Sequence, residues 1–182
     1  MKSFFTIHAG EFLVGSFIEK KLKNLNVWIP SKDTGIDLLV TNTDNSKTLG
    51  IQVKFSKDYT VTHTTENIRR GLSSYGWWAF GRDKIIRSKA DYWILVLHSF
   101  SEKNIQYIII KPNELLERLE KIHGKEKRIQ SYLWITSRRK CWETRGLSRN
   151  DKILIANNRF KSRERDFTKY LNNWQSIKAL RK

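Results

Sequence analysis

Cysteine and long apolar runs are nearly absent from this sequence. Cys141 is the only cysteine among 182 residues, so no disulfide can form within the chain, and this usage is typical of a reducing compartment. No stretch reaches the roughly 18 consecutive apolar residues that a transmembrane helix needs. The N-terminal run MKSFFTIHAGEF is not a convincing signal peptide, because His8 and Glu11 interrupt it and no small-residue cleavage site follows. We therefore expect a cytoplasmic protein that makes no contact with a membrane.

The short motifs of the common nucleotide and metal sites are also missing. Neither G-x-x-x-x-G-K-[ST] nor G-x-G-x-x-G occurs, which excludes the usual phosphate cradles for nucleoside triphosphates and dinucleotides. The four histidines (His8, His63, His98 and His123) show no metal-ligand spacing, and Cys141 has no Cys/His cluster around it. A zinc site is therefore not expected. We interpret His98 as structural and His63 as a loop residue.

Acidic residues are scarce relative to basic ones. The chain has 35 Lys and Arg against 18 Asp and Glu, which gives a formal net charge of +17 and a pI near 10.1. Such a basic domain is typical of proteins that bind a polyanion, because neutralising phosphates releases condensed counterions. An anionic membrane surface is the competing interpretation, but no basic amphipathic helix with a lipid-facing side is evident. Hydrophobic residues make up 39% and aromatic residues 12% of the chain, so it can form a folded core.

Apolar periodicity predicts an α/β fold. From apolar side chains at helical spacing we predict helices over residues 8–24, 66–72, 112–124 and 165–180. From short apolar or alternating runs we predict strands over residues 27–30, 35–41, 49–55, 91–100 and 106–112, with a hairpin within 131–147. Residues 151–158 are compatible with a strand or a loop, and the aromatic, Gly-punctuated stretch 73–84 has no assigned element. The order of elements favours a central mixed β-sheet flanked by helices.

The chain is predicted to form one domain over residues 1–182, since no strong linker interrupts it. The composition changes near residue 137. Residues 137–182 hold 14 Lys and Arg against 4 Asp and Glu, so more than half of the excess positive charge lies there. We interpret this part as a basic C-terminal extension, either belonging to the same domain or forming a lid on it.

The predicted hairpin GIDLLVTNTDNSKTLGIQVK (35–54) carries polar residues where strands are usually apolar. With the turn centred between Asp44 and Asn45, the antiparallel register places Asp37 opposite Gln52. Lys54 lies two residues further on and points to the same side. The other side of both strands is apolar, and a slip of one residue would bury Gln52 and Lys54 there. The alternative interpretation is a solvated outer face with a surface ion pair.

A further acid lies on the first predicted helix. Glu11 shares a helical stripe with Val14, Ile18 and Leu22, and an acid on an apolar stripe lies at its edge or has a buried partner. Glu19 is the alternative acid of this helix, but the lysines around it indicate a solvated position. We therefore take Glu11 as the candidate site residue of this helix.

These motifs together resemble those of the PD-(D/E)XK nuclease superfamily. The residues that carry the resemblance are an acid on the first helix, G-x-D at residues 35–37 and Q-x-K at residues 52–54. This superfamily has the fold of many restriction endonucleases and of archaeal Holliday-junction resolvases. The motifs cover about residues 10–55, and the buried strand predicted over 91–100 with the strand and helix after it is compatible with that core. The resemblance implies a restriction endonuclease-like core and hydrolysis of DNA phosphodiester bonds.

The resemblance also implies a role for each residue. Asp37, the side-chain oxygen of Gln52 and the carbonyl of Val53 would hold Mg²⁺ (or Mn²⁺), and Glu11 would complete the shell directly or through water. The ion would polarise the scissile phosphate and acidify a water, as one of two metals or alone. Lys54 would position or deprotonate the attacking water, or stabilise the charge that develops at phosphorus, and we favour positioning over the role of general base. Gln52 departs from the commoner Asp or Glu, which weakens metal binding, although some branches of the superfamily carry glutamine here.

Other basic and aromatic residues are candidates for nucleic-acid contacts. The stretch 73–84 combines Trp77 and Trp78 with Arg82 and Lys84, so a tryptophan could stack on a base. The alternative is that one tryptophan packs in the core and the other covers a loop. Towards the C-terminus, the candidate phosphate-binding residues are Arg138, Arg139, Lys140, Arg145, Arg159, Lys161 and Arg163. An ordinary solvated surface is the alternative for these residues.

The sequence as a whole predicts a Mg²⁺-dependent endodeoxyribonuclease with DNA as its partner. The first alternative, motivated by Gln52, is a nucleic-acid-binding protein with weak or no activity on a nuclease scaffold. A weaker alternative is a basic domain that binds an acidic protein. Cleavage of both DNA strands would favour a homodimer, although the sequence identifies no interface.

Overall fold

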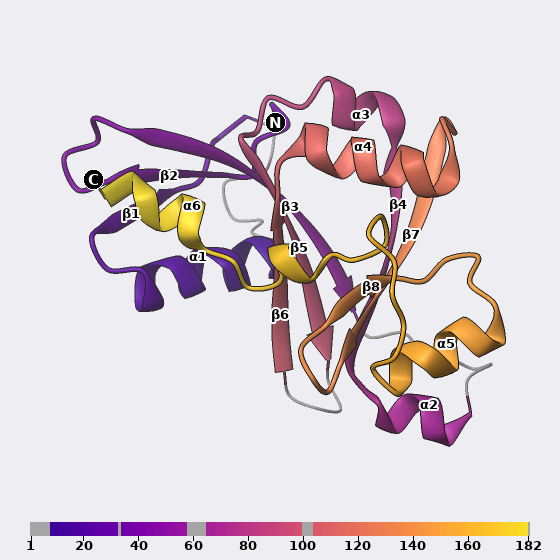
Figure 1. Ribbon diagram of the computed structural model, residues 1–182. Helices are drawn as coiled ribbons and strands as arrows, with labels where there is room; N and C mark the ends of the chain where they lie inside the picture. Colours follow the sequence, from indigo (N-terminus) through magenta and orange to yellow (C-terminus); the bar gives the residue numbers. More distant parts are fainter. Residues whose placement is uncertain (1–7, 33, 58–64, 100–103, 182) are drawn as a thin grey trace.

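The computed structural model describes residues 8–32, 34–57, 65–99 and 104–181, so His63 lies outside the described residues. Its helices are α1 (Ala9–Lys21), α2 (Glu66–Arg70), α3 (Arg82–Ile86), α4 (Pro112–His123), α5 (Arg149–Ala156) and α6 (Gln175–Lys178), with 3-10 turns η1 (Thr168–Tyr170) and η2 (Ala179–Arg181). Its strands are β1 (Leu25–Trp28), β2 (Leu38–Asn42), β3 (Thr48–Lys57), β4 (Leu72–Gly81), β5 (Tyr92–Ser99), β6 (Asn104–Ile110), β7 (Arg128–Thr136) and β8 (Cys141–Glu143). Figure 1 shows their arrangement. No helix among the described residues is long and apolar enough to cross a membrane.

The larger sheet has five strands in the order β1-β2-β3-β5-β6. β3 and β5 pair in parallel, whereas the other neighbours pair antiparallel. β5 lies inside the sheet and is buried on both faces from Trp93 to Leu97, as its nearly continuous apolar run predicts. The predicted α/β class with a central mixed sheet is therefore confirmed.

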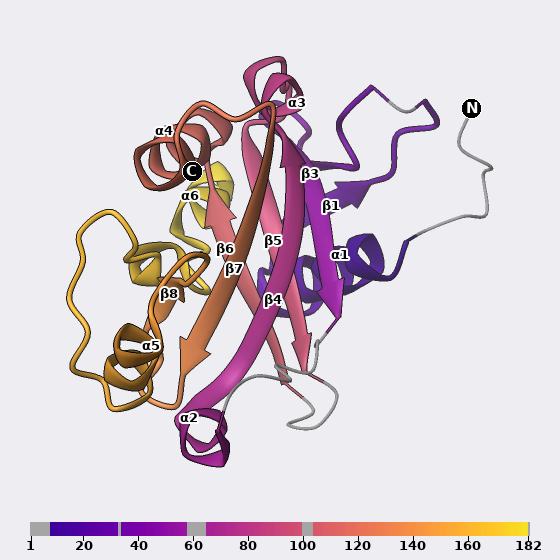
Figure 2. The same ribbon diagram turned by 90° about the vertical axis from the view of Figure 1, so that its right-hand side faces the viewer.

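Helices and a second sheet cover the two faces of the larger sheet (Figures 1 and 2). On one face, Val14 and Ile18 of α1 share a hydrophobic cluster with Trp174, Ile177 and Leu180 near the C-terminus. The other face packs against the three-stranded antiparallel sheet β4-β7-β8, together with α3 and α4. α2 and α5 pack together around a smaller cluster at the lower end of both views.

The hairpin predicted within residues 131–147 is confirmed as β7 and β8 of the second sheet. The third strand of this sheet was not expected, because residues 73–84 have no assigned element in the sequence-based prediction. They form most of β4, which pairs with β7, and the beginning of α3. Along β4, Trp78 and Phe80 are buried whereas Trp77 is 44% exposed, the alternation of a half-buried strand. The two tryptophans therefore divide between core and surface. The glycines of this stretch suggest turns, but here the ring of Trp78 packs over Gly76.

The prediction of a strand or loop over residues 151–158 was wrong for residues 151–156, which belong to helix α5, whereas residues 157 and 158 form a turn after it. The helix begins after Ser148, whose hydroxyl accepts a hydrogen bond from the backbone N–H of Asp151 (3.1 Å). Asp151 in turn accepts the backbone N–H of Ser148 (3.2 Å). This reciprocal pair is a capping box formed by an Asp three residues after the serine, so the S-x-x-D pattern at residues 148–151 is the sequence signal of the helix start.

The predicted helix over residues 165–180 was also wrong, because this segment crosses the edge of the larger sheet. Phe167 and Tyr170 pack into the cluster on one face, whereas Trp174 and Ile177 pack into the cluster on the other. Between them, Asn172 has a positive φ of 50° and exchanges two hydrogen bonds with the backbone of Tyr107 in β6 (2.7 and 3.0 Å). The helical spacing of these apolar residues therefore reflects two separate contacts. The basic C-terminal part of the chain contributes to both clusters.

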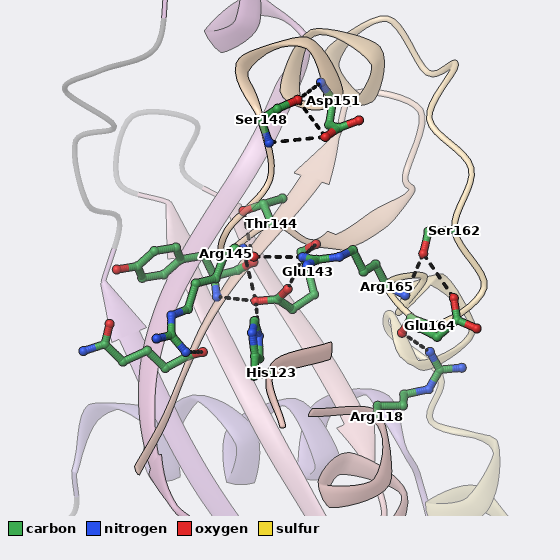
Figure 3. Close-up of polar contacts among 12 residues, drawn as sticks. Arg118, His123, Glu143, Thr144, Arg145, Ser148, Asp151, Ser162, Glu164 and Arg165 are labelled. Atoms are coloured by element: carbon green, nitrogen blue, oxygen red, sulfur yellow. Dashed lines mark hydrogen bonds and ion pairs between the residues drawn. The ribbon is translucent and has the colours of Figure 1, made fainter. Parts of the chain in front are cut away.

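A buried carboxylate fixes the C-terminal segment to the second sheet (Figure 3). Glu143 of β8 is 0% exposed and accepts a hydrogen bond from Arg165 (2.8 Å) and the backbone N–H groups of Tyr132 and Arg145 (3.3 and 3.2 Å). His123 Nε2, at the end of α4, lies 3.1 Å from the Glu143 carboxylate. This cluster joins α4, the second sheet and the C-terminal segment.

Arg118 of α4 holds the same segment through its backbone (Figure 3). Its Nη1 donates to the carbonyls of Glu164 (2.8 Å) and Asp166 (3.0 Å), and its Nε donates to the hydroxyl of Tyr170 (2.8 Å). Nearby, the thiol of Cys141 is fully buried, which raises its pKa, and the negative charges of Asp166 and Glu143 raise it further. Several basic residues of this region therefore serve the fold.

Candidate active site

The β2–β3 hairpin has the register that the sequence predicts. Leu38 pairs with Ile51 and Val40 pairs with Leu49, which places Asp37 opposite Gln52. The backbone N–H of Asp37 donates to the carbonyl of Ile51 (2.8 Å), so the pairing continues beyond the end of β2. The Gln52 amide donates from Nε2 to Oδ2 of Asp37. The predicted meeting of these two side chains is confirmed.

Asp37 is buried, with only 7% of its surface exposed. Besides the Gln52 amide, its Oδ2 accepts the backbone N–H of Val53 (2.7 Å). A buried carboxylate needs such donors, because burying it without partners costs several kcal/mol. Gly35, two residues before Asp37, has a φ of 83°, a conformation that favours glycine. The G-x-D motif therefore sets the backbone that directs Asp37 inward.

Glu11 lies in the first turn of α1 and is 4% exposed. Its carboxylate accepts the backbone N–H of His8 (3.5 Å) and lies at the helix N-terminus, where the dipole favours negative charge. The helix approaches β3 closely at Gly10. A Cβ built on Gly10 would lie only 2.8 Å from Cβ of Phe55, so glycine allows the approach that places Glu11 beside the hairpin.

Lys54 extends along the aromatic ring of Trp93. Its Nζ lies 5.5 Å from the ring centroid, within cation–π range. Trp93 is 3% exposed, and its indole N–H donates to the hydroxyl of Ser88 (2.8 Å), which fixes the ring. The parallel pairing of β3 with β5 sets Trp93 beside Gln52 and so supplies the surface on which Lys54 rests.

These residues line one cavity of about 860 Å³. The predicted residues that the structure brings together there are Glu11, Asp37, Gln52, Val53, Lys54 and Lys84. A solvated outer face, the alternative interpretation of the hairpin, does not fit the burial of Asp37. Residues not singled out from the sequence complete the cavity, among them Arg87, Lys89 and Trp93. They come from the chain just before and within β5, and only the parallel pairing of β5 with β3 could have placed them.

The remaining predicted nucleic-acid-binding residues do not line this cavity. Arg82 forms an ion pair with Glu120 (2.6 Å), and Arg145 lies 3.6 Å from Glu126, so both contact acids of the fold. The other six are exposed, on the β7–β8 turn and in the segment after α5, namely Arg138, Arg139, Lys140, Arg159, Lys161 and Arg163.

The donor set of the cavity fits a hard divalent cation such as Mg²⁺ or Mn²⁺. Two buried carboxylates, Glu11 and Asp37, and the amide of Gln52 line the same space, and such oxygen donors suit these ions. The described residues contain no group of three His, Cys, Asp or Glu side chains arranged for a metal, so the amide is needed as a ligand. Because Gln52 presents Nε2 to Asp37, its amide would rotate to offer Oε1.

No family model matches the chain, and no curated protein or solved structure is significantly similar to it. The functional argument therefore rests on the residues and their geometry.

Proposed function

We propose that this protein is a metal-dependent endonuclease that hydrolyses DNA phosphodiester bonds on a restriction endonuclease-like core. The observation that carries the proposal is the convergence of Glu11, Asp37, Gln52 and Lys54 on one cavity. The elements that bear these motifs, α1, β2 and β3, pack together with the buried strand β5 beside them, as such a core requires. The net charge of +17 supports a polyanionic substrate.

The side chains of the cavity have two different roles in the proposed reaction. Glu11, Asp37 and Gln52 would hold a divalent cation, which supplies polarisation of the phosphate and a lowered pKa for a water. The Lys54 ammonium, held over the Trp93 ring, lines the same cavity as these acids and would stabilise the negative charge that builds on the phosphate oxygens during attack. We propose that Lys54 acts by its charge and its position and not as the base that accepts the proton of water.

Supercoiled plasmid tests this function. We expect the purified protein to nick or linearise the plasmid with Mg²⁺ or Mn²⁺ and to do neither in EDTA. Asp37→Asn should abolish cleavage, whereas Asp44→Asn, an exposed acid on the turn of the same hairpin, should leave it intact. Absence of cleavage by the wild type with either ion, or equal cleavage by Asp37→Asn, would reject the proposal.

The hydrogen bond from Gln52 to Asp37 favours a second candidate, a DNA-binding protein without cleavage. The amide supplies the donor that a buried carboxylate needs, so the site is satisfied without a cation. This candidate predicts salt-sensitive DNA binding that Asp37→Asn leaves unchanged, and no heat of Mn²⁺ binding at the site in calorimetry. Mn²⁺ binding that Asp37→Asn removes would exclude it.

We further propose that the protein works in the cytoplasm, since its only cysteine is a buried free thiol. A homodimer stays a prediction that depends on double-strand cleavage. Sedimentation velocity of the protein bound to a DNA duplex in EDTA, where no cleavage occurs, measures the number of protein chains per duplex.

A further inference from the structure

One short stretch of chain lines the cavity with three basic residues and a single acid, Asp83 of α3. Lys84 of α3 and Arg87 and Lys89 of the segment after it line the cavity and are exposed. None of the three forms an ion pair with another residue in the described part of the chain. Arg82, at the start of the same helix, is held by Glu120 (2.6 Å). The three free cations therefore remain available to a ligand.

The backbone that carries these cations is fixed. Ile85 of α3 is 2% exposed and belongs to the hydrophobic cluster between the two sheets. The hydroxyl of Ser88 accepts the indole N–H of Trp93 (2.8 Å) and the backbone N–H of Ala90 (3.3 Å). A fixed backbone lowers the entropy that is lost when the side chains bind.

The cavity differs in net charge between two of its sides, because Asp83 offsets only one of the three cations of the crossover, and Lys54 only one of the two acids of α1 and the hairpin. Glu11 and Asp37 come from α1 and the hairpin, whereas Lys84, Arg87 and Lys89 come from the crossover between β4 and β5. A reacting phosphate held at the acidic side through a cation would be continuous with neighbouring phosphates of the same strand. We propose that Lys84, Arg87 and Lys89 form the subsite that binds the DNA phosphates flanking the scissile bond. This inference rests on the proposed function and assigns its substrate-binding wall.

The more basic C-terminal region is the natural comparison. Arg138, Arg139 and Lys140 occupy the β7–β8 turn, and Ser137 beside them donates its N–H to the carbonyl of Gly71 next to α2. Figures 1 and 2 place α3 at the upper end of the molecule and α2 at the lower end. These turn residues are exposed and carry the same charge as the α3 wall, but they do not line the cavity. The sequence also made these turn residues candidates for phosphate binding, so a variant of equal charge at this turn tests that prediction against the α3 wall.

The test measures binding without cleavage. Anisotropy of a short fluorescein-labelled DNA duplex is followed in EDTA over a series of salt concentrations. Each lost phosphate contact lowers the slope of log K against log salt by about 0.9. We expect the triple variant Lys84→Gln/Arg87→Gln/Lys89→Gln to lower this slope by about two to three. The variant Arg138→Gln/Arg139→Gln/Lys140→Gln, with the same charge removed, should leave the slope within about 0.5 of the wild type.

Circular dichroism of both variants confirms that they fold, which the exposure of all six side chains leads us to expect. An unchanged slope in the α3 variant, or equal losses in the two variants, would overturn the inference. Because the measurement needs no metal and no cleavage, its outcome is separate from that of the plasmid assay. A selective loss of slope in an inactive protein would support the phosphate subsite while rejecting the nuclease.

Discussion

The amide of Gln52 donates a hydrogen bond to Oδ2 of Asp37 across the β2–β3 hairpin. A second acid at this position would add negative charge next to Asp37, whereas the neutral amide supplies a donor. With the N–H of Val53 on the same oxygen (2.7 Å), the buried carboxylate is satisfied by the protein itself. The site can therefore fold without a cation, and a cation must compete with the amide for Asp37.

Replacing that amide with an acid should strengthen metal binding. In Gln52→Glu, a second carboxylate faces Asp37, and the added charge should raise the affinity for Mn²⁺ at least about tenfold, or ~1.4 kcal/mol. Without metal, the variant should lose roughly 1–3 kcal/mol of unfolding free energy, because Asp37 loses a donor and gains a like charge. Calorimetric titration and urea unfolding in EDTA measure the two effects. Gln175→Glu, on an exposed position of α6, is the control, and equal Mn²⁺ affinity in all three proteins would refute the assignment of Gln52.

The ring of Trp93 should contribute to turnover through Lys54. Trp93→Leu removes the surface on which the ammonium rests (5.5 Å), and a cation–π contact of ~1 kcal/mol corresponds to a fall in kcat of about fivefold. KM should stay the same, because binding of the DNA backbone does not involve the ring. Trp93→Phe should restore most of kcat, and Trp77→Leu, an exposed tryptophan of β4, should have no effect. A change confined to KM would contradict this role.

Gly10 and Gly15 of α1 should respond oppositely to alanine. At Gly10 a Cβ would lie 2.8 Å from Phe55 and 3.2 Å from Val53, so Gly10→Ala should cost about 1–3 kcal/mol of unfolding free energy through overpacking. At Gly15 the nearest atom, on Val27, is 3.6 Å away, and Gly15→Ala should stabilise the helix by about 0.5–1 kcal/mol. Urea unfolding measures both. If both variants were more stable than the wild type, α1 would not need the close approach to β3 at Gly10.

Glu143 should be essential to the stability of the second sheet. Glu143→Gln leaves Arg165 and His123 without the carboxylate that they contact, and removing one partner of a buried ion pair costs roughly 3–5 kcal/mol. Glu164→Gln, an exposed acid of the same segment, should change the unfolding free energy by less than about 0.5 kcal/mol. Urea unfolding measures both variants, and equal denaturant midpoints for Glu143→Gln and Glu164→Gln would contradict this account.

The hairpin could be predicted from the sequence because its information is local. Two alternating runs and a short polar turn define the register, and a slip would have buried Gln52 and Lys54. The pairing of Leu38 with Ile51 follows directly. The position of Glu11 could also be predicted, because it shares the apolar stripe of α1, and that stripe faces the core.

Of the basic wall of the cavity, the sequence predicted only Lys84, because the positions of Arg87 and Lys89 depend on a parallel pairing across a long crossover. Arg87 and Lys89 line the cavity only because β5 lies beside β3. Nothing in the local sequence pattern around them indicates that pairing. The prediction of one helix over residues 165–180 failed for a similar reason. The apolar residues of this segment are spaced like a helix, but Tyr170 and Trp174 pack on opposite faces of the sheet.

The most direct test of the central claim is a crystal structure grown with Mn²⁺ and measured at a wavelength where manganese scatters anomalously. We predict an anomalous peak in the cavity, about 2.1 Å from a carboxylate oxygen of Asp37, with the Gln52 amide rotated so that Oε1 faces the ion. Well-ordered crystals without a peak at this site, and with Nε2 of Gln52 still on Asp37, would contradict the account.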